Sequence, residues 1–170
     1  MKRILISFSI LFASQSGFTQ SIVNTSLELS YIVRYKALAI LEMKIFRIPA
    51  SIILAQGLVE SGAGTSELAI KANNHFGIKC KEDWFGETYL HTDDLKDECF
   101  RKYPSTSESF RDHSVFLAQR KRYDFLFVYS ITDYKSWAKG LSAAKYATDI
   151  NYAKKLVAMI ELYNLSVLDK

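Results

Sequence analysis

The stretch at residues 48–79, IPASIILAQGLVESGAGTSELAIKANNHFGIK, constrains the fold more than any other part of the sequence. Proline is accepted in the first turn of a helix, and Pro49 is followed by an almost unbroken apolar run up to Val59. Such a run needs burial on most sides, so it predicts a buried helix. Ser61 and Gly62 provide the flexible residues at which helices commonly end.

Glu60 occupies the last turn of this predicted helix, on the same face as Gln56 four residues earlier. A carboxyl group in apolar surroundings is costly to ionise, so its pKa is expected to be raised, which suits a general acid near neutral pH. The alternative is a solvated surface carboxylate, which is the usual condition of a lone glutamate at a helix end. Gln56 has two interpretations as well: it lines the same wall as Glu60, or it satisfies a backbone group.

A second short helix and a polar turn are expected directly after Glu60. Thr65 or Ser66 is placed to cap a helix through about Ala72, and residues 73–77, NNHFG, have the composition of a turn. Glu60 is therefore expected to face a loop rich in hydrogen-bonding groups.

Four motifs in series resemble the glucosaminidase domain of bacterial peptidoglycan hydrolases, glycoside hydrolase family 73. They are ESGAGTS with NNHFGIK at residues 60–79, CFRKYPS at 99–105, SFRDH at 109–113 and YATDINYA at 146–153. The resemblance extends over residues 31–163 and implies an α+β, mostly helical, lysozyme-like fold with a small antiparallel β lobe. It also implies hydrolysis of β-1,4 bonds after N-acetylglucosamine in peptidoglycan glycan strands. Ala63 departs from the commoner family pattern, which has a tryptophan between the two glycines.

The resemblance also suggests roles for individual residues. Glu60 is the expected acid, and Tyr146 is expected to face the cleft and support the reacting sugar or its charge; its structural alternative is packing against Trp137. Substrate-binding positions are expected at Gln56, Asn74, Phe76, Gly77 and Tyr152. For Tyr152, packing against the last helix is an equal alternative.

The second catalytic group is expected in the acidic loop of the β lobe, where the candidates are Asp93, Asp94, Asp97 and Glu98. Asp94 is preferred because it lies in the middle of the loop, where mobility can bring it over the cleft. A solvated acidic turn is the structural alternative. A substrate acetamido oxygen that attacks in place of a protein group is a further possibility.

Cys80 and Cys99 are the only cysteines, and they flank the segment expected to form the β lobe. The runs WFGETYL and CFRKY around a polar loop predict two or three short antiparallel strands. In an exported protein, such an even pair is typically a disulfide. We therefore predict a Cys80–Cys99 bond that stabilises the lobe.

The first residues have the layout of a secretory signal peptide, with Met1-Lys2-Arg3 followed by a ten-residue apolar segment, ILISFSILFA. Cleavage is expected near Ser16 to Gln20, giving a signal peptide at residues 1–20 and one catalytic domain at 21–170. A retained anchor is the alternative. The mature chain is expected to be exported to the periplasm or the extracellular space, without stable membrane insertion.

About 150 residues then remain, enough for one domain with its own core. Removal of Lys2 and Arg3 lowers the formal charge from +4 to +2, which is far from the dense basic patch of a nucleic-acid binder. The three histidines are not spaced as a metal set, so neither a metal nor a cofactor is expected. We expect a monomer.

Capping patterns predict two further helices. Thr25-x-x-Glu28 is expected to start one that runs to about Phe46, and Ser105-x-x-Glu108 to start another that runs to about Arg120. Asp112-His113 falls within the second helix and has no serine in a recognisable nucleophile motif, so it is expected to be a surface pair.

Two other functions remain open at this point. A muramidase or lytic transglycosylase would use a single glutamate on a similar fold to cut the neighbouring bond. A wall-binding module without activity would have the same cleft but no need of Glu60.

Overall fold

The structure is a computed structural model of residues 1–170, and it describes residues 15–170 except residue 94, with side chains described from Thr25 onward. The predicted signal segment falls mostly on residues 1–14, outside the described part. Helices and strands follow in this order: α1 (Gln15–Phe46), α2 (Ala50–Ser61), α3 (Glu67–Ala72), β1 (Thr88–His91), β2 (Glu98–Arg101), α4 (Thr106–Gln119), the 3-10 helix η1 (Lys121–Val128), α5 (Tyr134–Ala143), α6 (Tyr152–Leu162) and the 3-10 helix η2 (Leu165–Leu168).

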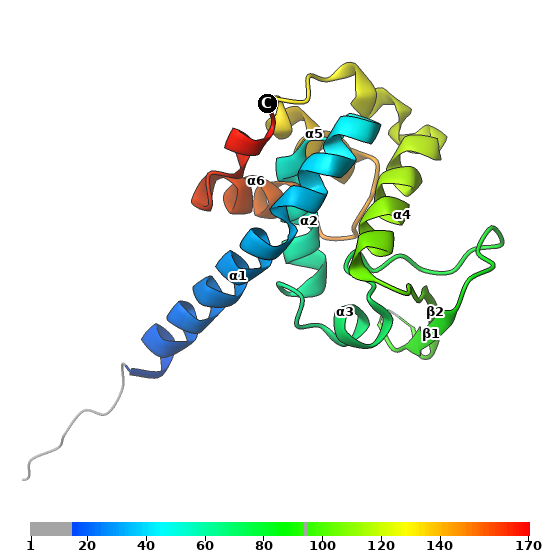
Figure 1. Ribbon diagram of the computed structural model, residues 1–170, viewed down its shortest axis with the longest axis horizontal. Coiled ribbons are helices and arrows are strands. Elements are labelled where there is room, and N and C mark those ends of the chain that lie inside the picture. Colours follow the sequence, from blue (N-terminus) through cyan, green and yellow to red (C-terminus); the bar gives the residue numbers. More distant parts are fainter. Residues whose placement is uncertain (1–14, 94) are drawn as a thin grey trace, which may run out of the picture.

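The predicted buried helix is α2, and the other helices pack around it (Figure 1). It contacts α1, α5, α6 and η2. Its residues from Ala50 to Leu58 are all buried, as the apolar run requires. The helix ends at Gly62, whose φ of 55° lies in the left-handed region that glycine adopts most readily.

The N-terminus of α2 is stabilised from the far end of the chain. Pro49 offers no side-chain cap, but the Asp169 carboxylate accepts hydrogen bonds from the Ser51 amide at 2.8 Å and the Ser51 hydroxyl at 2.5 Å. Asp169 is 1% exposed. A carboxylate is favoured at this position, because free N–H groups and the positive end of the helix dipole meet there. The C-terminal segment therefore closes over the start of the central helix.

Helix α1 lies along one side of the body, with its first turns extending beyond the other helices (Figure 1). It ends at Phe46 as predicted, but the predicted start at Thr25 is wrong, because the helix already runs from Gln15. Glu28 serves a tertiary contact, since its carboxylate accepts a hydrogen bond from the Tyr163 hydroxyl.

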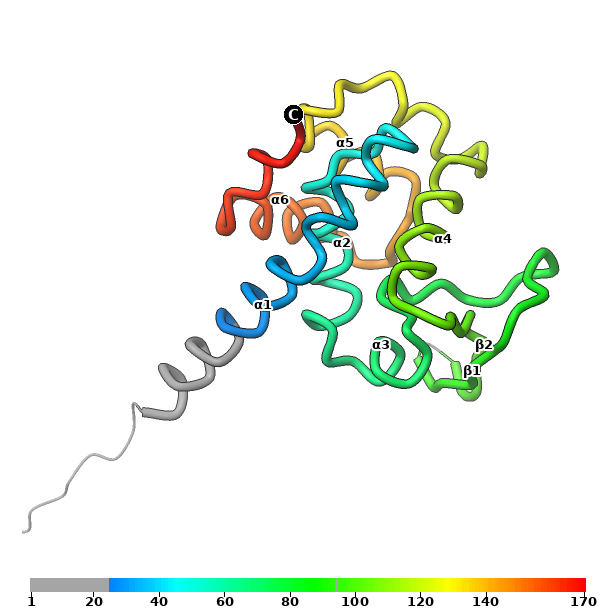
Figure 2. The backbone as a smooth tube through the Cα atoms, in the orientation of Figure 1, coloured from blue at the N-terminus to red at the C-terminus, as the bar shows by residue number. Residues whose placement is uncertain are grey.

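The small β lobe has two antiparallel strands, with Thr88 paired to Arg101 and His91 to Glu98. In Figure 2 the chain leaves the body after α3, turns through the hairpin and returns to α4. The predicted disulfide between Cys80 and Cys99 is present and joins the strand β2 to the segment before β1. The lobe is thus tied at its base to the turn after α3.

Helix α4 begins after Ser105, whose hydroxyl accepts from the Glu108 amide at 3.4 Å, as the capping pattern predicted. The expectation of a surface pair at Asp112-His113 is wrong. His113 is 0% exposed and stacks on Phe76 with ring centroids 3.9 Å apart. Asp112 is bound by the guanidinium of Arg101 at 3.0 Å.

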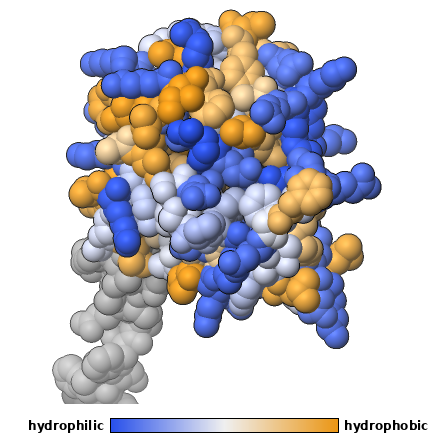
Figure 3. All heavy atoms as spheres, turned by 45° about the vertical axis from the view of Figure 1, so that its right-hand side comes forward, coloured by the Kyte–Doolittle hydropathy of each residue, from blue (hydrophilic) through white to orange (hydrophobic). Residues whose placement is uncertain are grey.

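These elements confirm an α+β fold that is mostly helical with a small antiparallel lobe. In the part of the chain that the structure describes, no helix is both long and apolar enough to cross a membrane. Figure 3 shows one face of the molecule, on which hydrophilic side chains project around the edge and separate several hydrophobic patches.

Candidate active site

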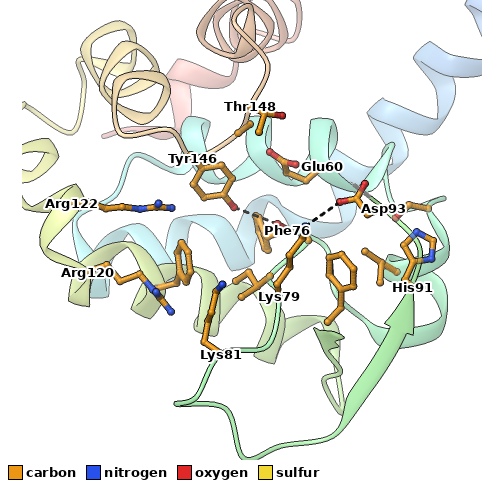
Figure 4. Close-up of a pocket in the computed structure, with 17 residues that line it drawn as sticks. Glu60, Phe76, Lys79, Lys81, His91, Asp93, Arg120, Arg122, Tyr146 and Thr148 are labelled. Carbon is orange, nitrogen blue, oxygen red and sulfur yellow. Dashed lines mark hydrogen bonds and ion pairs between the residues drawn. The ribbon is translucent and has the colours of Figure 1, made fainter. Parts of the chain in front are cut away.

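A pocket of about 560 Å³ lies where the end of α2 meets the β lobe, the end of α4 and the loop before α6 (Figure 4). Seventeen residues line it: Glu60, Ser66, Leu68, Phe76, Gly77, Ile78, Lys79, Lys81, His91, Asp93, Phe100, Phe116, Arg120, Arg122, Tyr146, Ala147 and Thr148. The list includes Glu60, Tyr146, Phe76 and Gly77 from the sequence-based predictions.

Glu60 projects into this pocket from the last turn of α2 (Figure 4). The Tyr152 hydroxyl donates a hydrogen bond of 2.6 Å to the Glu60 carboxylate. Gln56 Nε2 in turn donates to the Tyr152 oxygen at 3.0 Å. This chain of hydrogen bonds fixes the orientation of Glu60 from the protein side and leaves the rest of its carboxyl group toward the pocket.

The pKa of Glu60 is raised, mainly because burial disfavours the charged form. The hydrogen bond from Tyr152 acts in the opposite direction, while the negative charge of Asp93 adds to the rise. The carboxyl group thus holds its proton to a higher pH than a solvated glutamate does.

Tyr146 lies across the pocket from Glu60 in the loop before α6. Its ring stacks on Tyr152 with centroids 5.7 Å apart and an angle of 11° between the planes, and its hydroxyl donates to the Phe76 carbonyl at 3.5 Å. Burial, followed by the charge of Glu60, raises the pKa of Tyr146 well above its ordinary value. The phenol is therefore neutral and presents a polar group to the pocket.

The turn at residues 73–77 forms the floor of the pocket through Phe76 and Gly77. Asn74 supports it from behind, because its side chain donates to the Ile78 and Arg101 carbonyls and accepts from the Ile78 amide, all within 3.0 Å. Gly77 has a φ of 61°, which allows the chain to reverse direction here.

Three of the predicted substrate-binding residues lie behind the wall and not in it. Gln56, Asn74 and Tyr152 are at most 2% exposed and are absent from the lining. Their polar atoms bond to protein groups, except for Gln56 Oε1, which has no hydrogen-bond partner among the described residues. These three residues support Glu60 and the turn at residues 73–77 that forms the floor of the pocket.

The loop of the β lobe brings Asp93 into the pocket, where it lies on the side of Glu60 away from Tyr146 in the view of Figure 4. Its carboxylate lies 3.9 Å from the Lys79 ammonium, which also binds Glu98 at 2.7 Å. The preferred candidate Asp94 lies outside the described residues. Among the carboxylates that the structure describes, Glu60 and Asp93 line this pocket.

Several lining residues were not singled out from the sequence. Thr148 and Lys79 belong to motifs that carried the family resemblance, so these motifs could have identified them as candidate pocket residues. Arg120 and Arg122 belong to a basic run, RKR at residues 120–122, that follows α4 directly. Only the fold shows that this run reaches the pocket.

Within the described ranges 15–93 and 95–170, no group of three or more histidine, cysteine, aspartate or glutamate side chains is placed to hold a metal ion. The histidines have separate environments. His75 contacts the Tyr31 hydroxyl at 3.0 Å, and its pKa is lowered to about 4 by burial. His91 pairs with Glu67 at 3.2 Å, and burial lowers the pKa of His113 to about 3.

Residues 36–165 match the family described as glucosaminidase, mannosyl-glycoprotein endo-beta-N-acetylglucosaminidase. The chain is similar to the exo-glucosaminidase LytG of Bacillus subtilis, with 35% identity over 137 residues that cover 74% of this chain and 48% of that protein. It is also similar to the peptidoglycan hydrolase FlgJ of Salmonella typhimurium, with 33% identity covering 67% of this chain and 39% of FlgJ. The chain thus spans about half or less of the length of these relatives.

Solved structures give the same result for the fold. The glycoside hydrolase domain of Salmonella typhimurium FlgJ superposes with a TM-score of 0.67 at 30% identity, covering 81% of this chain and 88% of that one. A peptidoglycan hydrolase from Sphingomonas sp. A1 superposes with a TM-score of 0.70 at 26% identity, covering 83% and 94%. The helical body with its β lobe is therefore a lysozyme-like fold.

Proposed function

The chain belongs to the glucosaminidase family, and on that premise we propose that it hydrolyses the β-1,4 bond after N-acetylglucosamine in peptidoglycan, as an endo-β-N-acetylglucosaminidase. The observation that carries this proposal is Glu60, a carboxyl group with a raised pKa that projects into a pocket of about 560 Å³. Hydrolysis of this bond needs a carboxylic acid that protonates the leaving oxygen. Glu60 is that acid.

The residues around Glu60 fix the orientation of its carboxyl group and affect its pKa. Tyr152, held by Gln56, keeps one carboxylate oxygen occupied, so that the other oxygen faces the glycosidic bond. The neutral hydroxyl of Tyr146 faces the reacting sugar, where its lone pairs stabilise the positive charge that develops in the oxocarbenium-like transition state. Phe76 and Gly77 form the floor on which the sugar rests.

The second group comes from the β lobe or from the substrate. Asp93 lines the same pocket as Glu60, and its neighbour Asp94 remains a candidate from the sequence. A carboxylate at this side either attacks the anomeric carbon or activates water. If neither aspartate acts, the substrate's own acetamido oxygen is the nucleophile.

Product analysis tests the proposed bond. Purified peptidoglycan is digested, the new reducing ends are reduced with borohydride, and the amino-sugar alcohols are identified. The proposal predicts reduced glucosamine at the new ends. Reduced muramic acid would indicate a muramidase instead, and anhydro-muramic ends would indicate a lytic transglycosylase.

The position of the cut along the strand needs a separate measurement, because the family description says endo and the LytG relative is named an exo-enzyme. We propose endo cleavage. Long glycan strands then shorten to intermediate lengths early in the digest, whereas exo cleavage releases disaccharide from the start.

We also propose that the chain works outside the cytoplasm, in the periplasm or the extracellular space, as a monomer after loss of residues 1–20. The Cys80–Cys99 disulfide supports this location, because such bonds persist in oxidising compartments. Detection of the shortened chain in the exported fraction tests the proposal. Full-length chain in the cytosolic fraction would contradict it.

A further inference from the structure

One end of the pocket carries a group of cations that cleavage of the glycosidic bond does not need. Lys81, Arg120 and Arg122 line the pocket; in the view of Figure 4, the two arginines lie on the side of Tyr146 away from His91 and Asp93, and Lys81 lies below Tyr146. They come from two separate segments, the stretch after Cys80 and the basic run after α4. The fold, and not sequence proximity alone, gathers them here.

The two arginines are held in place by aromatic rings. The Arg120 guanidinium lies 4.2 Å from the centroid of Phe116, and that of Arg122 lies 4.7 Å from the centroid of Tyr123. Arg122 also donates to the Tyr123 hydroxyl. Stacking of this kind orders a long side chain before a ligand arrives, so less conformational entropy is lost on binding.

The charges of this group are mostly uncompensated by the protein. Arg120 lies 3.6 Å from Asp83, which is itself largely exposed. Neither Lys81 nor Arg122 forms an ion pair with any residue that the structure describes. Lys79, which also lines the pocket, differs because it pairs with Asp93 and Glu98. Lys81, Arg120 and Arg122 thus form a positive surface in the same pocket as Glu60.

N-acetylglucosamine is neutral and offers such cations nothing beyond ordinary hydrogen bonds. Muramic acid differs, because its lactyl group carries a carboxylate when it is free and a peptide with its own carboxylates when it is substituted. Arginine matches a carboxylate through two parallel N–H donors in one plane. A strand that alternates the two sugars would place a carboxylate beside every second ring.

We propose that Lys81, Arg120 and Arg122 form a binding site for the carboxylates carried by muramic acid, on the lactyl group or on the attached peptide. The inference rests on the proposed function, since it requires a peptidoglycan strand in the pocket. It makes the pocket selective for wall glycan over a neutral polymer of N-acetylglucosamine. These residues bind and select, and they take no part in the chemical step.

Binding measurements test the site without turnover. In a Glu60→Gln background, calorimetry is carried out with three ligands of matched length: a neutral N-acetylglucosamine oligomer, a peptide-free glycan strand and a peptide-bearing strand. The double change Arg120→Gln with Arg122→Gln is compared with Arg34→Gln, an exposed arginine that also lies over a tyrosine ring, at 5.4 Å, but outside the pocket. Thermal unfolding of each variant verifies that it is folded.

The double variant is expected to bind the carboxylate-bearing strands about 10-fold more weakly, because two partly exposed contacts between an arginine and a carboxylate are lost. Binding of the neutral oligomer should be unchanged, and the difference should shrink in high salt. Weaker binding of the peptide-free strand alone assigns the lactyl carboxylate, and weaker binding of the peptide-bearing strand alone assigns the peptide carboxylates. Weaker binding of both charged strands shows that the site accepts either carboxylate.

Equal loss for all three ligands, no loss for any, or no binding by the Glu60→Gln protein itself would overturn the proposed site. Release of reducing ends from peptidoglycan by the unmodified protein is measured in parallel. If the protein cleaves peptidoglycan but its binding does not depend on ligand charge, the carboxylate-binding site is contradicted and the proposed function stands. If the protein does not cleave peptidoglycan, the proposed function itself is contradicted.

Discussion

At the scale of the residue, Tyr152 sets the proton affinity of the proposed acid. Its hydroxyl donates to the Glu60 carboxylate and so stabilises the charged form, against the larger effect of burial. A general acid works while it is protonated, so the rate falls as pH rises through its pKa.

Tyr152→Phe should therefore raise the pKa of Glu60 further and move the alkaline limb of the pH–rate profile to higher pH. We expect the rate at the optimum to fall by about 10-fold, because the carboxyl group loses a fixed partner. The profile of kcat/KM on peptidoglycan measures both effects, with Tyr134→Phe, a surface tyrosine that binds Glu161, as the control. An alkaline limb that stays in place or moves to lower pH would contradict this role.

Single substitutions can also identify the second catalytic group. Asp93→Asn is expected to lower kcat by about 100-fold, because this carboxylate lines the same pocket as Glu60. Asp94→Asn is the matched comparison one position along, and steady-state rates on peptidoglycan rank the two. A large loss at Asp94 alone would restore the sequence-based preference, and full activity of both variants would point to the substrate's acetamido group.

The sequence indicated Glu60 but not the contacts that control it. An acid at the end of a long apolar helix can be read from local pattern, since burial of that helix is implied by its composition. Tyr152 lies 92 positions away from Glu60, and no local pattern reveals that their side chains meet. The prediction for Asp112-His113 was wrong for the same reason, because Phe76 stacks on the buried His113 and Arg101 binds Asp112 from other parts of the chain.

At the scale of the element, the β lobe depends on its disulfide. Two four-residue strands offer little buried surface, and such a hairpin alone is marginal in water. The Cys80–Cys99 bond closes a loop of 19 residues in sequence separation.

Replacing both cysteines by serine should lower the free energy of unfolding by roughly 3 kcal/mol, by the loop-closure estimate. Asp93 is carried by this lobe, so activity should fall even at temperatures where the helical body stays folded. Chemical denaturation and peptidoglycan cleavage are measured together, and the intact protein should show no free thiol by Ellman titration. Unchanged stability and unchanged activity of the serine variant would contradict this role of the bond.

Helix ends show which local signals are reliable. Ser66 and Ser105 cap their helices as predicted, because the hydrogen bond from a cap reaches only two or three residues along the chain. Thr25-x-x-Glu28 has the same pattern, yet it lies inside α1. A capping pattern is compatible with the start of a helix. Where the helix continues through the pattern, as in α1, it does not set the helix boundary.

At the scale of the whole molecule, the chain returns at its C-terminus to the start of the helix that carries Glu60. Asp169 binds the amide and hydroxyl of Ser51 and lies in a buried position beside α2. No local sequence pattern indicates this contact, because the two residues are 118 positions apart.

Asp169→Ala should lower the free energy of unfolding by about 2 kcal/mol, since the first turn of α2 loses its cap and a buried hydroxyl loses its partner. Thermal and urea denaturation measure the effect, with Asp124→Ala as an exposed control. Equal stability of the two variants would show that the C-terminal segment does not hold the helix.

The fold class was predicted correctly because it depends on pattern over long stretches: apolar runs for the helices, and aromatic runs around a polar loop for the lobe. The pocket could be predicted only in part. Glu60, Phe76, Gly77 and Tyr146 were found within the quoted motifs, while Lys81, Arg120 and Arg122 come from segments that meet only after folding.

The most direct test of the account is the rate of peptidoglycan cleavage by Glu60→Gln, measured beside its binding to intact wall. Glutamine keeps the size of the side chain but cannot supply a proton, so we expect a loss of about 100-fold or more in rate with wall binding retained. Cleavage within a few-fold of the unmodified protein would contradict the assignment of Glu60 as the acid, and with it the proposed mechanism.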